Sequence, residues 1–167
     1  MKTARLYTNS PANTWLNGDF FNSLGAIEQA TVKQVKIPYC SSPSSGTVAS
    51  GVNGLSVKSF ILCPYEVGGA TYSNISASPI DGVKLDYFED GIATSAKNKR
   101  IAYNNGTTTA ADWWTRSPNT DTSGIWAILT DGSFSQNVST DKSKGVRPAL
   151  ILPFTALFDK DTKILKG

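Results

Sequence analysis

The fold is decided by residues 113–138, which read WWTRSPNTDTSGIWAILTDGSFSQNV. Residues 113–117 and 124–129 read as two strands separated by a polar stretch, and Asp131-Gly132 follows the second strand. Thr130-Asp131-Gly132 is a predicted hairpin turn, because Asp-Gly readily supplies positive φ, so residues 133–138 are expected to return as a third strand. The stretch therefore predicts an antiparallel sheet in the last third of the chain.

Alternation along these strands predicts which side chains lie inside the sheet. Phe134 and Val138 share one side and are predicted to point inward, whereas Ser133, Ser135 and Asn137 point outward. Trp113 and Trp114 are adjacent, so one of them should enter the core. Along residues 124–129 the two-residue period does not decide which side is buried, because both sides carry apolar residues. The expected core comprises Trp113 or Trp114, Ile125, Ile128, Val146, Leu150 and Leu152.

The rest of the chain predicts helices before strands. Residues 13–34 repeat apolar side chains at three- and four-residue steps, and Gly18 and Gly25 are expected to split this segment into short helices. Residues 32–39, 55–62 and 146–152 read as strands, and residues 41–54 as an exposed loop. Helices early and an antiparallel sheet late indicate an α+β fold, in a single domain of residues 1–167.

Composition narrows the class of protein. Of the 167 residues 40% are hydrophobic and 17% are charged, and the formal net charge is +3. So few charges favour extracellular β-rich proteins and binding surfaces over cytosolic metabolic enzymes. The basic residues are scattered, which argues against a nucleic-acid partner. No segment reaches the ~20 apolar residues of a membrane span, so no membrane insertion is expected.

Chemistry-bearing residues are sparse. The chain has two cysteines, Cys40 and Cys63, and no His. Two half-buried thiols are favoured over a disulfide, and two cysteines alone cannot supply a zinc site. Without His the commonest general base is missing, so we expect neither catalysis nor a cofactor. Arg116 and Arg147 are expected to brace the sheet through hydrogen bonds to carboxylates or carbonyls, with Asp112 and Asp131 as candidate partners.

Four motifs in order carry a resemblance to a known family. They are WLNGDFF at residues 15–21, FILCPYEVG at 60–68, WWTRSP at 113–118 and GVRPAL at 145–150. Together they resemble an uncharacterised domain family of Firmicutes and their phages, whose members carry W-L-N-G-x-F-Y, F-L-L-S-x-x-E-V-G, W-W-L-R-S-P and G-V-R-P-A-L. Thr115 stands where the family usually has Leu, and Cys63 where it often has Ser. The first strand expected before the WLN motif is missing or very short, which suggests a truncated domain or a fragment of a longer phage tail or surface protein.

The resemblance implies a fold and a function. The family's end motifs are similar to those of C-type-lectin-like and formylglycine-generating-enzyme-like domains, and to the variable proteins of diversity-generating retroelements. We therefore expect short helices with a twisted antiparallel sheet in such a domain. The implied function is a non-enzymatic ligand- or receptor-binding module, displayed on a virion or an extracellular bacterial surface. The alternative is a structural tail or capsid assembly domain with no ligand of its own.

The expected site is the C-terminal hairpin with its loops. Small polar side chains around a Trp resemble an antibody paratope. If Trp126 lies outside, it is the anchor of this face; if it is buried, its loss destabilises the domain instead. The expected partner is a host-surface protein or glycan, with a possible homo-oligomer, trimeric if on a tail fibre. The candidate ligand-binding residues, expected on one contiguous exposed face, are Trp114, Asn119, Asp121, Ser123, Trp126, Ser133, Ser135, Asn137, Ser139 and Asp141.

Overall fold

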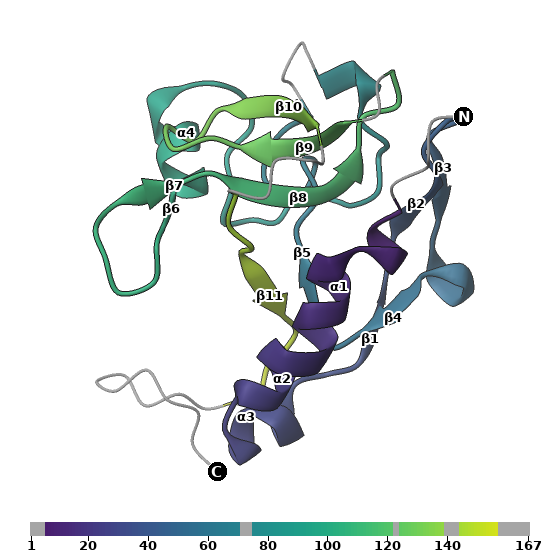
Figure 1. The fold of residues 1–167 in the computed structure, drawn as a ribbon, viewed down its shortest axis with the longest axis vertical. Helices are drawn as coiled ribbons and strands as arrows, with labels where there is room; N and C mark the ends of the chain where they lie inside the picture. Colours follow the sequence, from purple (N-terminus) through teal and green to yellow (C-terminus); the bar gives the residue numbers. More distant parts are fainter. Residues whose placement is uncertain (1–5, 71–74, 122–123, 139–143, 157–167) are drawn as a thin grey trace.

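A run of helical turns, purple in Figure 1, opens the part of the chain that the computed structural model describes, which is residues 6–70, 75–121, 124–138 and 144–156. Ser10 caps this run, because its Oγ accepts a hydrogen bond from the Asn13 amide at 3.1 Å. The helix continues through Gly18 as a π-helical turn and ends where Leu24 becomes extended. The predicted break near Gly25 is therefore confirmed, and the break at Gly18 is wrong.

The elements are short throughout. Among the described residues no helix has the length and apolar character needed to cross a membrane. The helices are η1 (Tyr7–Asn9), α1 (Pro11–Trp15), η2 (Leu16–Phe20), α2 (Phe21–Ser23), α3 (Ala26–Thr31), η3 (Gly51–Asn53), η4 (Ile75–Ala77) and α4 (Thr94–Arg100). The strands are β1 (Val35–Ile37), β2 (Tyr39–Ser42), β3 (Thr47–Ala49), β4 (Leu55–Val57), β5 (Ser59–Ile61), β6 (Ala102–Tyr103), β7 (Ala110–Ala111), β8 (Trp113–Pro118), β9 (Gly124–Ile128), β10 (Phe134–Val138) and β11 (Pro148–Leu150).

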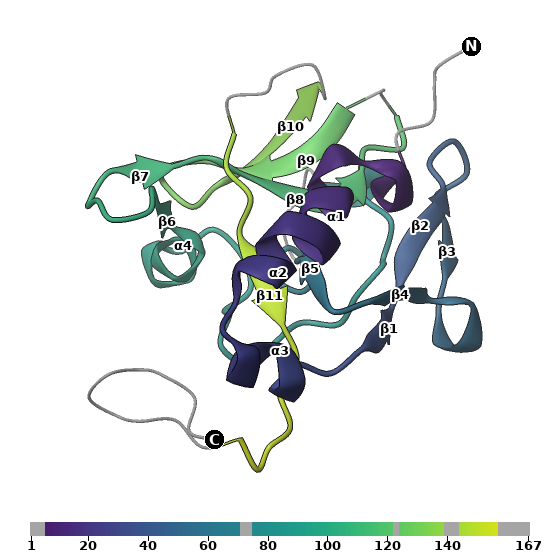
Figure 2. The same ribbon diagram turned by 60° about the horizontal axis from the view of Figure 1, so that its bottom comes forward.

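A three-stranded antiparallel sheet, ordered β10-β9-β8, occupies the place that the sequence predicts. The chain turns at Asp131-Gly132, where Gly132 has a φ of 79°, so the hairpin prediction is confirmed. The last strand does not join this sheet. Instead β11 pairs antiparallel with β5, and Figures 1 and 2 show it running beside β5 below the sheet. Through this pairing β11 connects the end of the chain to β5, in the middle of the sequence.

Small two-stranded sheets make up the rest: β1 with β4, β2 with β3, and β6 with β7, all antiparallel. The hairpin of β2 and β3 lies where an exposed loop was expected, so that prediction is wrong. Gly46 closes the hairpin at a φ of 66°, a conformation that only glycine adopts at low cost. The protein is thus a mixed α+β molecule with a few short helices and small antiparallel sheets.

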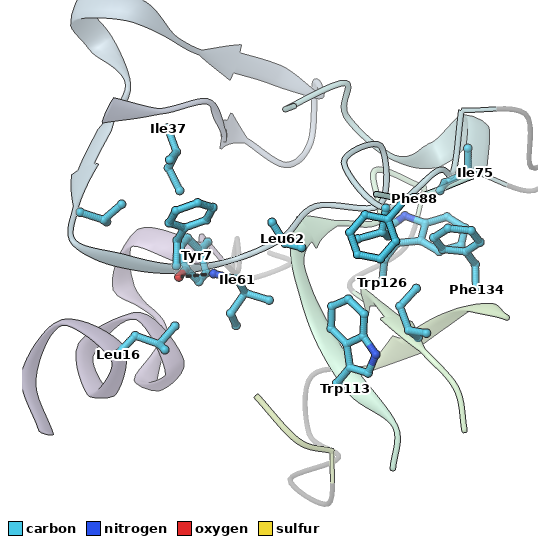
Figure 3. Close-up of a cluster of buried hydrophobic side chains, with 14 of the residues drawn as sticks. Tyr7, Leu16, Ile37, Ile61, Leu62, Ile75, Phe88, Trp113, Trp126 and Phe134 are labelled. Carbon is cyan, nitrogen blue, oxygen red and sulfur yellow. Dashed lines mark hydrogen bonds between the residues drawn. The ribbon is translucent and has the colours of Figure 1, made fainter. Parts of the chain in front are cut away.

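The core lies under the three-stranded sheet and extends towards the N-terminal helices. Trp113 and Ile128 are buried as expected, and Phe134 points inward. These side chains pack with Trp126, Phe88 and Ile75 in Figure 3, while Tyr7, Leu16 and Ile61 form its other end. The expected core residues Ile125, Val146, Leu150 and Leu152 are only partly buried. Leu150 was expected in the core of the C-terminal sheet, but its strand β11 lies outside that sheet and pairs with β5 instead.

Candidate functional site

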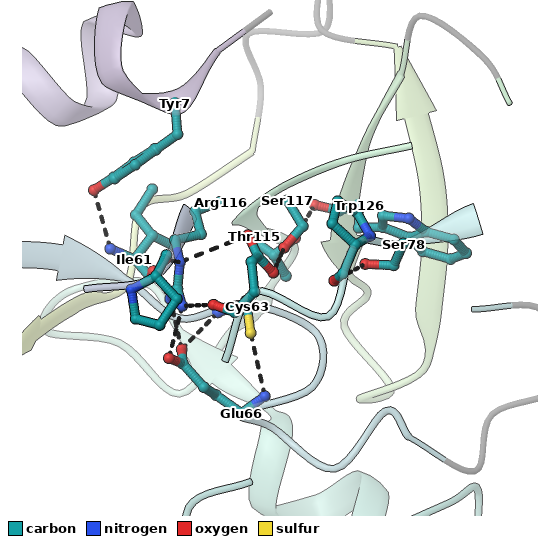
Figure 4. Close-up of polar contacts among 12 residues, drawn as sticks. Tyr7, Ile61, Cys63, Glu66, Ser78, Thr115, Arg116, Ser117 and Trp126 are labelled. Atoms are coloured by element: carbon teal, nitrogen blue, oxygen red, sulfur yellow. Dashed lines mark hydrogen bonds and ion pairs between the residues drawn. The ribbon is translucent and has the colours of Figure 1, made fainter. Parts of the chain in front are cut away.

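The candidate site is a face of the three-stranded sheet, and a buried ionic cluster holds one strand of that sheet, β8. Arg116, on β8, is the centre of this cluster and its side chain is fully buried. Its Nη1 donates to Glu66 Oε2 at 2.6 Å and its Nη2 to Glu66 Oε1 at 2.7 Å, a two-pronged pair (Figure 4). The same guanidinium donates to the carbonyls of Pro38 at 3.1 Å, Ile61 at 3.0 Å and Asp81. Arg116 therefore joins four separate segments of the chain.

A second carboxylate completes the cluster. Asp81 Oδ1 accepts a hydrogen bond from Ser117 Oγ at 2.6 Å, whereas Asp81 Oδ2 lies 3.8 Å from Arg116 Nε and has no hydrogen-bond partner in the described part of the chain. Burial raises the pKa of Asp81, and the charge of Arg116 opposes that shift. One buried guanidinium thus faces two carboxylates, which makes the charged form of Asp81 costly.

Cys63 borders the cluster and is held by the same glutamate. Its backbone amide donates to Glu66 Oε2 at 2.8 Å, and the Glu66 amide donates to Cys63 Sγ at 3.4 Å. Burial raises the pKa of the Cys63 thiol well above its usual value. A thiol with a raised pKa is a poor nucleophile at neutral pH. Cys63 and Cys40 are both free, so the preference for thiols over a disulfide is confirmed, but both are buried instead of half-buried.

The expected bracing role of Arg116 is confirmed, but the candidate partners are wrong. Asp112 pairs with Lys144 at 2.6 Å, and Asp131 pairs with Lys97 at 2.8 Å. Both aspartates lie at strand ends near the surface, where flexible lysines reach them. Glu66 could have been found from the sequence, because it lies in one of the four family motifs and Arg116 lies in another.

Arg147 contacts rings more than carboxylates. Its guanidinium carbon lies 5.3 Å from the centre of the Trp113 ring and 5.8 Å from that of Phe88. Its one hydrogen bond among the described residues, of 3.4 Å, goes to the carbonyl of Arg100. Burial lowers the pKa of Arg147. Arg147 therefore covers the core beside the sheet by cation–π contact.

Arg100, at the end of α4, holds the tip of the β9–β10 hairpin. Its Nε donates to the Gly132 carbonyl at 2.7 Å, and its guanidinium lies over the Phe134 ring at 4.6 Å. Lys97, one turn earlier in α4, forms the ion pair with Asp131. The approach is close enough that a Cβ on Gly132 would collide with the Lys97 carbonyl. The hairpin is thus fixed against α4, a contact that sequence reasoning missed.

The outer face of the three-stranded sheet is the surface that this frame presents. Register places Trp114, Ala127 and Ser135 in one row across β8, β9 and β10. Trp113, Ile128 and Phe134 point to the core from the neighbouring row, so the row of Trp114 faces the other way. Trp114, Ser135 and Ile125 are partly exposed on this face, whereas Ala127, between Trp114 and Ser135, is buried. Lys144 Nζ lies 5.8 Å from the centre of the Trp114 ring.

Two candidate residues do not lie on an exposed face. Trp126 is 1% exposed, and it points into the core with Phe134 (Figure 3). Asn119 is also 1% exposed, and its Oδ1 accepts a hydrogen bond from the Asp121 amide at 2.9 Å. Their expected place on the surface is wrong. Trp126 shares its side of β9 with Ile128, and the core covers that side.

The remaining candidates divide into placed and unplaced residues. Asp121 is exposed, and Ser133 is partly exposed with its Oγ 2.5 Å from Asp131 Oδ1. The Lys97 ion pair and the Ser133 hydrogen bonds lower the pKa of Asp131. Asn137 lies opposite Ile125 in the β9–β10 register. The side chain of Asn137, and Ser123, Ser139 and Asp141 altogether, lie outside the described residues.

Comparison with known proteins points to one family. The model of a family described as "Domain of unknown function (DUF6273)" matches residues 2–154. No curated protein and no solved structure matches the chain. Within the described residues, no group of three or more His, Cys, Asp or Glu side chains is placed to hold a metal ion.

Proposed function

This chain belongs to the DUF6273 family of domains of unknown function, and we propose that it is a non-enzymatic binding module that contacts its ligand or receptor through the outer face of β8, β9 and β10. The observation that carries this proposal is the partly exposed Trp114 in one row with the partly exposed Ser135, on either side of the buried Ala127. A tryptophan supplies a large contact area with few rotatable bonds, and serine adapts its hydrogen bonds to the ligand.

Two features support binding over catalysis. The buried charged groups are hydrogen-bonded within the protein, since the Arg116 guanidinium donates to Glu66 and to three backbone carbonyls. The Cys63 thiol is buried with a raised pKa, which disfavours the thiolate that a nucleophile requires. Buried polar groups that are paired in this way stabilise the fold. The surface that is available for recognition is then the outer face of the three-stranded sheet.

The frame supports recognition by holding the face in one shape. Arg116 secures β8 from below, and Arg100 secures the hairpin tip through the Gly132 carbonyl. A surface that is already ordered before it binds loses less conformational freedom on binding. The contact row is therefore suited to a target that it meets without rearrangement.

The proposal includes a fold relationship and a place of action. We assign the α+β arrangement to the C-type-lectin-like and formylglycine-generating-enzyme-like domains, on the strength of the four-motif resemblance. Display on a phage particle or a bacterial surface agrees with a chain of which only 17% is charged. The target class is a host-surface protein or glycan.

One observation favours the alternative, a structural assembly domain without a ligand. Several apolar side chains in residues 82–92 are strongly exposed, as they are on subunits that pack against each other. The two functions differ in the fate of the outer sheet face. A binding module leaves that face open in the assembled particle, whereas an assembly domain buries it.

A screen of the purified chain on glycan and surface-protein arrays tests the proposal. The decisive variant is Ser135→Lys, which places a long side chain at the β10 end of the contact row. The matched control is Ser44→Lys, on the exposed turn between β2 and β3. We expect a target that the control retains and that Ser135→Lys loses. An array without a target, or a target that Ser135→Lys binds unchanged, contradicts the proposal.

A further inference from the structure

Residues 82–92 form a loop that exposes apolar side chains in an unusual number. Val83 is 82% exposed, Leu85 43%, Tyr87 62% and Ile92 63%. Single exposed apolar residues are ordinary on a soluble protein, but a group of them in one loop marks an interaction surface. We call this group the 82–92 loop surface. It is separate from the outer sheet face, so a partner that binds this loop is independent of the proposed function.

The loop is held in place from within, which leaves its apolar side chains outside. Phe88 is the internal anchor and packs into the core near Trp126 (Figure 3). Gly91 donates to the Gly68 carbonyl at 3.1 Å, and Arg100 Nη2 donates to the Gly91 carbonyl at 2.7 Å. The exposed side chains are therefore presented by a backbone that is already ordered, which lowers the entropy cost of association.

Charged residues of both signs lie in the loop beside the exposed apolar side chains. Lys84 and Asp86 carry opposite charges on either side of Leu85. Lys84 makes an exposed ion pair of 3.5 Å with Asp90, and in the described part of the chain Asp86 has no ion pair. In a twofold contact a residue i of one copy meets residue j of the other, and j meets i. Two loops that cross antiparallel at Leu85 thus bring each Lys84 to the Asp86 of the other copy.

We propose that the 82–92 loop surface is the contact of a homodimer with twofold symmetry. Val83, Leu85, Tyr87 and Ile92 form its apolar centre, and the Lys84–Asp86 pairs form its rim. A lipid surface fits the loop less well, because anionic headgroups repel the carboxylates of Asp86, Glu89 and Asp90, whereas a second copy also brings a Lys84 to the contact. A dimer would bury these four apolar side chains, which explains why they are exposed in the single chain.

Sedimentation equilibrium of the full chain tests the proposal. The concentration should run from about 1 µM to about 1 mM, where weak dimers populate both states. We expect a monomer–dimer equilibrium, and Val83→Ser should raise its Kd at least tenfold. The matched control is Val52→Ser, since Val52 is 83% exposed on η3, away from this loop. A chain that stays monomeric throughout the range, or equal effects of the two variants, would overturn the proposal.

A charge exchange tests the twofold geometry independently of apolar burial. Lys84→Glu alone places Glu opposite Asp86 of the other copy, and Asp86→Lys alone places Lys opposite Lys84. Each single variant should raise the Kd, and the double variant Lys84→Glu/Asp86→Lys should restore it, because opposite charges meet again. A double variant as weak as the singles is evidence against this contact. Cosedimentation with neutral or anionic vesicles that Val83→Ser abolishes would assign the surface to lipid instead.

Discussion

Arg116 on β8 and Glu66 in the loop after β5 form a buried pair in which two guanidinium nitrogens meet two carboxylate oxygens, at 2.6 and 2.7 Å. Glu66 also accepts a hydrogen bond from the Cys63 amide, so the pair fixes the loop that leaves β5. Arg is suited to this place because its planar fork matches a carboxylate. The pair therefore couples the C-terminal sheet to the centre of the chain.

Removing the arginine should destabilise the fold strongly. Arg116→Ala leaves two carboxylates, Glu66 and Asp81, buried without their cation, and breaking such a pair costs about 3–5 kcal/mol. The control is Lys97→Ala, which removes an exposed pair with Asp131 and should cost at most about 1 kcal/mol. Urea unfolding of both variants measures the difference. Similar losses would mean that the Arg116 cluster does not hold the fold.

The buried Asp81 predicts a pH dependence. Its pKa is raised in the folded state, so the stability linked to its proton is full below the ordinary value of 3.8 and is lost as the pH rises through the folded pKa. Asp81→Asn keeps an oxygen that accepts from Ser117 and removes the surplus negative charge. The variant should therefore gain stability over the native chain at neutral pH, and the gain should shrink towards pH 4. Thermal melts across this range that show a constant difference would contradict the prediction.

Trp126 should behave as a core residue. Trp126→Ala removes a fully buried ring and should cost about 3–5 kcal/mol. Trp126→Phe should cost clearly less, because the Trp126 Nε1 has no hydrogen-bond partner among the described residues. The exposed aromatic control is Tyr103→Ala, which should leave stability nearly unchanged. Chemical denaturation measures the free energy of unfolding of the three variants. A small loss of stability in Trp126→Ala would place the ring outside the core.

The hairpin tip predicts a glycine requirement. Gly132 and Gly106 have similar φ angles, 79° and 73°, but only Gly132 has a backbone neighbour, the Lys97 carbonyl, within reach of a Cβ. Gly106→Ala should cost about 1–2 kcal/mol, the cost of a left-handed conformation. Gly132→Ala should cost more, because it also separates the hairpin from α4. Melting temperatures of the two variants measure this difference. Equal losses of stability would show that the contact of Gly132 with α4 is unimportant.

The two thiols should be unreactive in the native chain. Burial raises the pKa of Cys40 to about 11, and it raises that of Cys63 well above its usual value. A thiol-specific reagent such as DTNB should therefore react slowly with the native chain at neutral pH. After unfolding without a reductant it should titrate both cysteines. Titration of none would reveal a disulfide and contradict the free thiols of the structure.

Local pattern determined the strands and turn of the C-terminal sheet. Asp131-Gly132 marked the hairpin, and Phe134 was correctly placed inside by alternation. Adjacent Trp113 and Trp114 were separated into a buried and a partly exposed ring. These features follow from the two-residue period of a strand and the φ preference of glycine, which act over a few residues and so are visible in the sequence.

Only the tertiary structure decided which side of each strand is buried and which residues it contacts. Both sides of residues 124–129 are apolar, so only the core packed against β9 determined that Trp126 is inside and Ile125 outside. The partner of Arg116 was likewise undecided, because Glu66 lies 50 positions away in the sequence. Burial and long-range charge pairing depend on which segments the folded chain brings together. A strand's period indicates that two sides differ, and the neighbouring layer determines which of them is covered.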